Sequence, residues 1–268
     1  MRTRIVILLV AAALAAGCRR SQPEVKIDPP ELKGPFPAAP IDQQLEAAVA
    51  EIGGKVARDE KAAAKPVVQV DLTSSKVNDA TLAEIPGLET VRSLVLGGAP
   101  ITDAGLSALK PNADLHTLYL GGTGITDKGL AHLRNFPNLR TLDVTGTKIT
   151  DAGLQHLDKH AALQVVALSD TAITDAGLEH LARHAQLQSL YLNNTSITDQ
   201  GLMLLKSLKQ LGTLSLNGTQ VGDAGLEHLK VISSLRSLSL ENTKATAKGS
   251  AGLQKALTGV KITGVPDE

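Results

Sequence analysis

The chain has 268 residues, and its 27 basic and 27 acidic side chains give a formal net charge of zero. A balanced charge does not attract nucleic acid, so no nucleic-acid partner is expected. Aromatic residues make up only 1% of the chain and Trp is absent, whereas a single-core globule of this length normally packs several large rings. The composition therefore favours a thin, regular core built from Leu, Ile, Val and Ala.

Residues 1–17 predict a secretory signal peptide. Arg2 and Arg4 form a positive start, and the apolar run 5–16 is too short to span a bilayer as a stop-transfer helix. Small residues then precede Cys18, the only cysteine of the chain. This arrangement resembles the lipobox of bacterial lipoproteins, which implies cleavage before the cysteine and lipidation of its sulfur. The alternative is an ordinary secretory leader, or an uncleaved anchor, with an incidental cysteine.

Residues 18–40 predict a lipidated, proline-rich tether. Six prolines remove backbone donors and bias this segment towards extended polyproline II. At about 3.1 Å per residue the segment reaches on the order of 70 Å, enough to hold the rest of the chain off a membrane. A filler without mechanical role is the alternative. Arg19 follows the cysteine in place of Asp, which in Gram-negative lipoproteins of the resembled type favours the outer membrane.

Residues 41–76 predict an N-terminal cap. Leu45, Val49 and Ile52 have helical spacing behind Asp42, and short strands are expected at 55–57 and 67–72. Such a unit would cover the open edge of the structure that follows.

Residues 77–244 contain a repeat of 24 residues. The string Ile-Thr-Asp-x-Gly-Leu begins at Ile101 and returns four times in phase without an insertion. A fixed period of this length indicates stacked supersecondary units. Leu118 and Leu120 alternate as in a half-buried strand, and the next leucines are spaced as on one helix face. The Asp that opens each helix is a natural N-cap, and the Gly two residues later suggests a close approach of backbones.

These repeats resemble leucine-rich repeats, and the Ile-Thr-Asp-Ala-Gly-Leu form resembles those of bacterial leucine-rich-repeat lipoproteins. The resemblance covers roughly residues 67–263 and implies an α/β fold, a right-handed βα superhelix with parallel strands on the concave side and helices on the convex side. Residues 245–268 would then form a degenerate C-terminal cap repeat. Val165–Val166–Ala167 replaces the usual polar-Leu-polar start of a repeat, which is a local irregularity in the middle strand. Thr replaces the usual Asn in one column, so an inward ladder of hydroxyl groups is expected at Thr123, Thr147, Thr171, Thr195, Thr219 and Thr243.

Two columns of side chains could bind metal, and both have a simpler explanation. The pairs His156/His160 and His180/His184 have i,i+4 spacing, but on the expected helices both members lie on a solvated flank. The recurring Asp could hold calcium, yet helix capping accounts for every member. No nucleophile, phosphate-loop or zinc-protease motif is present. We therefore expect no enzyme, cofactor or metal site.

The strand face that points outward on the concave side is the expected partner-binding surface. Both tyrosines of the chain fall in one column of it, and tyrosine is favoured at interfaces, although an exposed strand also tolerates it. The candidate partner-binding residues are Tyr119, Asp143, Tyr191, Asn193, Ser215, Asn217, Ser239 and Glu241.

The sequence thus predicts a membrane-anchored lipoprotein of the cell envelope that binds an unknown protein partner as a scaffold. Recognition of a glycan or peptidoglycan by the same Ser/Thr/Tyr/Asn face is the alternative.

Overall fold

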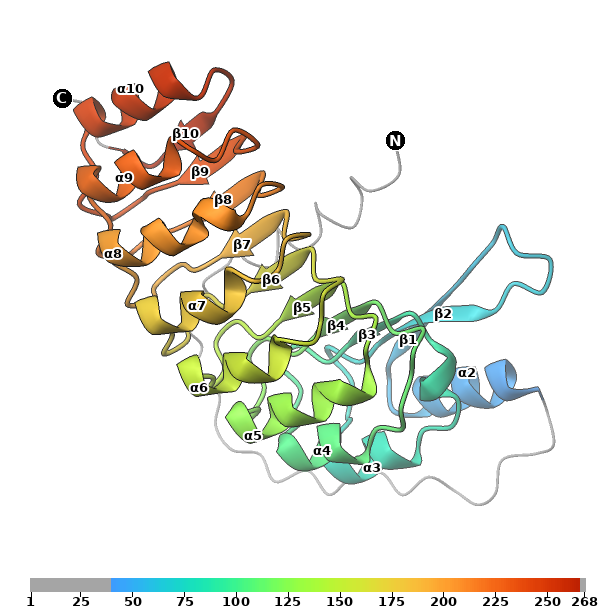
Figure 1. Cartoon of the computed structure of the whole chain (residues 1–268). Coiled ribbons are helices and arrows are strands. Elements are labelled where there is room, and N and C mark those ends of the chain that lie inside the picture. The colour runs from blue at the N-terminus through green and yellow to red at the C-terminus, as the bar shows by residue number, and fades with distance from the viewer. Residues whose placement is uncertain (1–39, 266–268) are drawn as a thin grey trace.

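In the computed structural model, which describes residues 40–265, one ten-stranded sheet carries helices along one side (Figure 1). The strands lie in chain order; β1 and β2 are antiparallel, and every later pair is parallel. The strands are β1 (Lys55–Arg58), β2 (Val67–Asp71), β3 (Ser93–Val95), β4 (Thr117–Tyr119), β5 (Thr141–Asp143), β6 (Val165–Ala167), β7 (Ser189–Tyr191), β8 (Thr213–Ser215), β9 (Ser237–Ser239) and β10 (Lys261–Thr263).

A short helix, in several repeats joined to a 3₁₀ turn, lies between successive strands from β2 onward. The α-helices are α2 (Ile41–Glu51), α3 (Asp79–Glu84), α4 (Asp103–Ala108), α5 (Asp127–Leu130), α6 (Asp151–Leu154), α7 (Leu178–Leu181), α8 (Asp199–Leu202), α9 (Asp223–Leu229) and α10 (Ala247–Ala256). The 3₁₀ turns are η1 (Leu88–Thr90), η2 (Ala131–Asn135), η3 (Gln155–Leu157), η4 (Asp175–Gly177) and η5 (Met203–Ser207).

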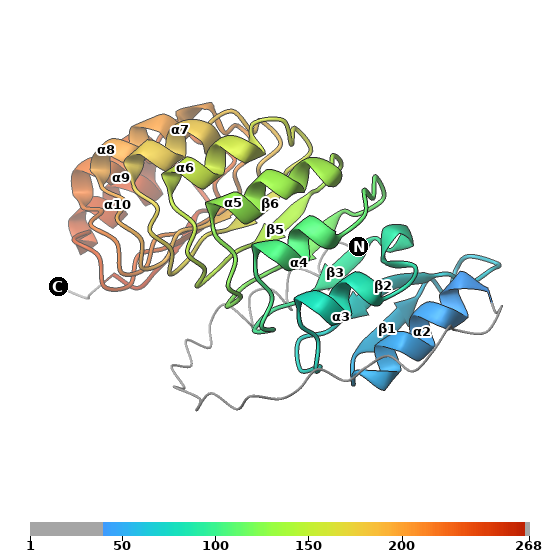
Figure 2. The same ribbon diagram turned by 90° about the horizontal axis from the view of Figure 1, so that it is seen from below.

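The repeats stack into a curved solenoid, with strands inside the curve and helices outside (Figure 2). Each strand pairs with the residues 24 positions further on, so Leu94, Leu118 and Leu142 lie side by side and are buried. The predicted α/β repeat architecture is confirmed. The irregular sequence of β6 does not disturb the sheet, because β6 pairs in register with both neighbours and Val166 fills the buried place of the leucine.

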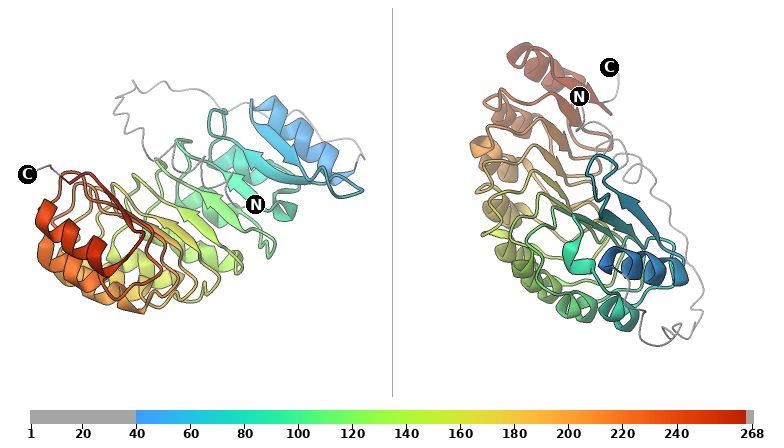
Figure 3. Two further views of the ribbon diagram at one scale, coloured as in Figure 1. Left: turned by 90° about the horizontal axis from the view of Figure 1, so that it is seen from above. Right: turned by 90° about the vertical axis from the view of Figure 1, so that its right-hand side faces the viewer.

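The ends of the solenoid differ from its middle. The strands expected at 55–57 and 67–72 are present as β1 and β2, and their hairpin projects beyond the first repeats (Figure 3). Helix α2 buries Leu45, Ala48 and Val49. Within the described residues, no helix has the length and apolar character needed to cross a membrane. The signal peptide, Cys18 and most of the tether lie outside the described residues.

A recurring Thr–Asp contact joins each repeat to the next. Thr126 is the N-cap of α5, where its hydroxyl accepts a hydrogen bond from the Lys128 backbone N–H at 3.3 Å. Asp103, the first residue of the preceding helix, accepts from the Thr126 N–H at 2.8 Å and from its hydroxyl at 2.6 Å. The same double contact recurs at Asp79–Thr102, Asp127–Thr150, Asp151–Thr174, Asp175–Thr198 and Asp223–Thr246.

The prediction that Asp caps each helix is therefore wrong: Thr is the cap, and Asp links the repeats. Glycine makes room for this link. A Cβ atom on Gly129 would clash with the Asp103 carboxylate and lie 2.8 Å from Ile125 Cγ2. The carboxylate of the preceding repeat thus packs closely against the glycine. Ile125 of the apolar core lies close to the same position.

The threonine column acts inside each repeat. The Thr123 hydroxyl donates to the Leu120 carbonyl at 2.6 Å, which closes the turn after the strand, and the other five members make the same contact. The six hydroxyls thus make inward hydrogen bonds as expected. Each bond stays within its own repeat, because a hydroxyl has one hydrogen and donates it to a carbonyl three residues away.

Candidate binding surface

The inner face of the sheet presents two columns of side chains, one on each side of the buried central column. Constant register places these residues in rows across neighbouring strands. One column consists of Ser93, Thr117, Thr141, Val165, Ser189, Thr213 and Ser237, and the other of Val95, Tyr119, Asp143, Ala167, Tyr191, Ser215 and Ser239.

Tyr119 and Asp143 lie opposite each other on β4 and β5 and are both half-buried. Burial, and next the negative charge of Asp143, raise the pKa of Tyr119 to about 12. Burial also raises the pKa of Asp143, against the lowering effect of its hydrogen bonds with Thr145, whose N–H donates at 2.9 Å. The pair thus offers a phenol that stays protonated, as donor, beside a carboxylate acceptor. Both groups are partly withdrawn from water, which strengthens a hydrogen bond to an incoming partner.

Tyr191 differs from Tyr119 because only 9% of it is exposed. Burial raises its pKa, and a hydrogen bond with the Ser189 side chain, itself 7% exposed, acts in the opposite direction. All three residues of β7 are buried. The expectation that both tyrosine rings stand free on an open strand face is therefore wrong for Tyr191, which contributes to the packing of the inner face and shows a partner little area.

The remaining candidates form a ladder where the strands end. The Asn193 amide oxygen accepts from the Ser215 hydroxyl at 2.6 Å and from the Asn217 N–H at 2.9 Å. The Asn217 amide oxygen in turn accepts from the Glu241 N–H at 2.8 Å. Ser169, which the sequence reading did not select, begins this ladder by accepting from the Asn193 N–H at 3.2 Å. The sequence does indicate this role, because Ser169 is a polar residue one repeat, or 24 positions, before Asn193.

In this ladder the amide oxygens of Asn193 and Asn217 accept hydrogen bonds, and the amide nitrogens take no part in it. Within the part of the chain that the structure describes, Nδ2 of Asn193 and of Asn217 has no hydrogen-bond partner. These two groups are donors available to a ligand. Glu241 is exposed, Ser239 is half-buried and Ser215 is buried.

The histidines are packed differently from the expectation. His160 and His184 are 2% and 1% exposed, so the prediction that they lie on a solvated flank is wrong. His160 Nε2 lies 3.0 Å from the Leu133 carbonyl of the preceding repeat, and His184 bonds to the backbone of His160. His156 is half-buried, and His180 Nδ1 lies 2.9 Å from Asp158.

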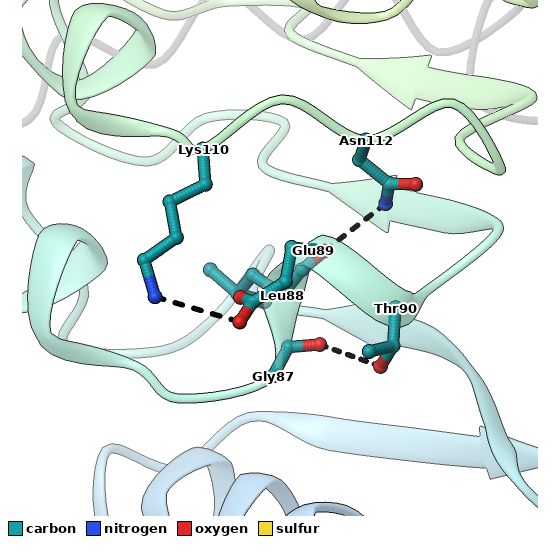
Figure 4. Close-up of polar contacts among 6 residues, drawn as sticks. All are labelled: Gly87, Leu88, Glu89, Thr90, Lys110 and Asn112. Carbon is teal, nitrogen blue, oxygen red and sulfur yellow. Dashed lines mark hydrogen bonds and ion pairs between the residues drawn. The ribbon is translucent and has the colours of Figure 1, made fainter.

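Asn112 occupies the place of His160 two repeats earlier. Figure 4 shows its amide directed towards the Leu88 carbonyl. It is 3% exposed, and its amide donates to the Leu88 and Val91 carbonyls at 3.2 and 2.8 Å. Helix and turn ends leave backbone carbonyls without partners, and these buried polar side chains satisfy them. The histidine column is thus explained by the fold. In the described residues no group of three or more His, Cys, Asp or Glu side chains is arranged to hold a metal ion.

Comparison with known proteins agrees with this repeat structure. A leucine-rich repeat family model matches residues 87–110, 112–133 and 137–157, three consecutive units of the solenoid. Internalin C2 of Listeria monocytogenes has a similar structure, with a TM-score of 0.60 over 83% of this chain and 92% of that chain. The fold is a leucine-rich-repeat solenoid. Its sequence identity to internalin C2 is 23%, so this likeness concerns the fold. A search of curated protein sequences finds no match.

The predicted leucine-rich-repeat fold is therefore confirmed, and the lipoprotein character stays a prediction. Solenoids of this kind are typical of protein–protein interaction and are generally non-catalytic.

Proposed function

We propose that this leucine-rich-repeat protein is a lipid-anchored component of a bacterial cell envelope whose inner face binds a protein partner. The fold supports the protein-binding part, because a curved stack of repeats offers one extended concave surface. The leader and Cys18 support the anchor, and this support comes from the sequence.

The observation that carries the proposal is the Tyr119–Asp143 pair on the inner face. Its phenol and carboxylate are adjacent, partly desolvated and turned towards the concave side. Aromatic residues with a polar tip are enriched among the residues that dominate binding energy at protein interfaces. Around the pair, the inner face offers mostly small polar side chains, which suit a polypeptide surface with its own backbone donors and acceptors.

The direct test is the Tyr119→Ala substitution, measured by titration against the partner. Loss of the ring should weaken binding by about 2 kcal/mol or more, while thermal stability changes little because the ring lies outside the leucine core. Met203→Ala on the outer face is the control, since Met203 is 41% exposed and lies on η5. Binding that falls with Met203→Ala and survives Tyr119→Ala would place the function on the helical side.

The free amide nitrogens of Asn193 and Asn217 favour glycan recognition as the second candidate, because sugar hydroxyls and carbonyls accept such donors. Asn217→Asp tests it well, since a carboxylate oxygen can still accept from the Glu241 N–H while the donor is lost. A glycan-binding protein would sediment with purified cell-wall sacculi and lose this property in Asn217→Asp. A protein binder would not sediment with them.

A further inference from the structure

The two edges of the solenoid, where strands and helices are joined, carry opposite charge. We define the basic edge as the seven helix-to-strand connections 85–92, 109–116, 133–140, 157–164, 181–188, 205–212 and 229–236. It contains ten basic side chains against the carboxylates of Glu89, Asp114 and Asp158; the ten are Arg92, Lys110, Arg134, Arg140, Lys159, Arg183, Lys206, Lys209, Lys230 and Arg236.

The opposite edge is acidic, and the fold explains why. In the seven strand-to-helix connections from 96–103 to 240–247, only Lys148 and Lys244 oppose eight carboxylates. Most of these carboxylates are the Asp residues that link one repeat to the next. These Asp carboxylates therefore already accept hydrogen bonds from the next repeat.

The cations of the basic edge are less completely paired. Arg92 pairs with Asp59 at 3.4 Å and Lys230 with Glu227 at 2.6 Å, and both carboxylates lie outside the edge. Only two of its three carboxylates are paired: Glu89 with Lys110 at 3.4 Å, and Asp158 with Arg183 at 3.0 Å. Five exposed cations near the middle of the solenoid make no ion pair with any described residue; they are Arg134, Arg140, Lys159, Lys206 and Lys209.

Helix dipoles explain the position of some basic side chains on this edge but not of the others. A cation in the last turn of a helix is stabilised by the carbonyl end, which suits Arg134 on η2 and Lys206 on η5. The effect fades within one turn, so it does not reach Arg140 or Arg236, each of which stands directly before a strand. The edge therefore carries more positive charge than the helix dipoles explain.

We infer that the basic edge docks on the anionic headgroups of a lipid bilayer. The cations extend along seven repeats whose strands are spaced about 4.8 Å apart, so the row is roughly 30 Å long at the sheet and longer at the helices. Such a row on one edge suits a plane of negative charge better than a short acidic segment. Each Lys or Arg near an anionic surface strengthens binding about five-fold at ordinary ionic strength.

The choice of a membrane over an acidic protein rests on the proposed anchor at Cys18. A tether that reaches on the order of 70 Å leaves the solenoid free to return to the bilayer that holds it. Docking by the edge would stand the solenoid on its side. The inner face, with Tyr119 and Asp143, would then open parallel to the membrane and stay accessible to a partner.

The test measures binding of the full chain carrying Cys18→Ser, which has no lipid, to sedimented vesicles. One set contains phosphatidylcholine alone, and the other equal parts of phosphatidylcholine and phosphatidylglycerol. The test variant replaces Arg134, Arg140, Lys206 and Lys209 with Glu. The matched control makes the same charge change at four exposed lysines outside the basic edge, replacing Lys76, Lys128, Lys148 and Lys244 with Glu.

Binding to anionic vesicles should fall in the test variant by roughly a hundred-fold or more and far less in the control, and it should weaken with added salt. Gln replacements at the same four positions should give an intermediate loss, and circular dichroism checks that each variant is folded. Equal loss in both Glu variants, salt-independent binding, or equally tight binding to poly-glutamate would overturn the inference. Because the chain has no lipid, the result is separate from whether Cys18 is modified or Tyr119 contacts a partner.

Discussion

At single residues, Thr, Asp and Gly of each repeat have three separate tasks. Thr126 caps a helix, Asp103 links that cap to the preceding repeat, and Gly129 leaves space for the carboxylate. Gly222 stands where the other repeats have Thr and keeps only the backbone half of the link, accepted by Asp199 at 2.7 Å. The helix of that repeat still forms, so the hydroxyl contact adds to stacking without being required for it.

Gly129→Ala should destabilise the solenoid by about 1–3 kcal/mol, because the added Cβ displaces the Asp103 carboxylate and presses on Ile125. This cost outweighs the gain in helix propensity, which is at most about 1 kcal/mol. Gly252→Ala is the control: it lies within α10, and the nearest atom to its added Cβ is Lys230 Nζ at 3.9 Å. That change should stabilise by about 0.5–1 kcal/mol. Denaturant unfolding measures both, and a stabilised Gly129→Ala would refute the role given to this glycine.

The sequence shows the Asp and Thr columns but not the partner of each. Asp103 and Thr126 are 23 residues apart, and only the stacking of repeats brings them together. From one repeat alone, Asp at a helix start has a local capping explanation, which is why the cap was assigned to Asp. The burial of Tyr191 could not be predicted for a similar reason, since its hydrogen bond with Ser189 depends on side-chain direction and not on sequence spacing.

At the level of elements, the helices are short and end in turns whose free carbonyls need donors. Asn112, His160 and His184 supply them from inside the core. Helical periodicity failed for His160 because η3 ends at Leu157, so His160 lies beyond the helix and turns inward. The strands and helices themselves were predictable, since leucines at fixed spacing identify the buried face of each.

His184 should make the solenoid sensitive to acid. Burial, as the main cause, lowers the pKa of His184 below its ordinary value of 6.5, so the unfolded chain takes up a proton more readily than the folded one. Stability is then lost as the pH falls through 6.5 towards the lowered pKa, by at most about 1.4 kcal/mol per pH unit. Leu208 fills the same place in the next repeat and is fully buried, so His184→Leu should be accommodated. Unfolding at neutral pH and near pH 5 should show a flatter pH dependence in the variant; an unchanged dependence would exclude His184 as its source.

At the level of the whole molecule, the balanced composition does not show that the fold places basic and acidic side chains on different edges. The formal net charge of zero belongs to the whole chain, in which the alternation of strand and helix places one basic and one acidic edge on opposite sides. The repeat period was enough to predict the solenoid and the inner face. It could not predict which inner side chains are engaged by neighbouring repeats, because these contacts depend on the register and curvature of the stack.

The anchor is tested by Cys18→Ser. No other thiol exists in the chain, so this change should abolish incorporation of labelled palmitate and release the protein from the membrane fraction of the cells that make it. Wild-type protein recovered entirely in the soluble fraction, or palmitate still entering the variant, would contradict the lipoprotein proposal and leave the leader as an ordinary signal peptide.

The measurement that tests the central claim most directly is photo-cross-linking in intact cells. A photoreactive phenylalanine analogue is placed at Tyr119 on the inner face or at Met203 on the outer face. We expect a defined protein adduct from position 119 and none from position 203, and Asp143→Lys beside the probe should reduce the adduct. An adduct formed only from position 203, or one from position 119 that Asp143→Lys leaves unchanged, would contradict binding by the inner face.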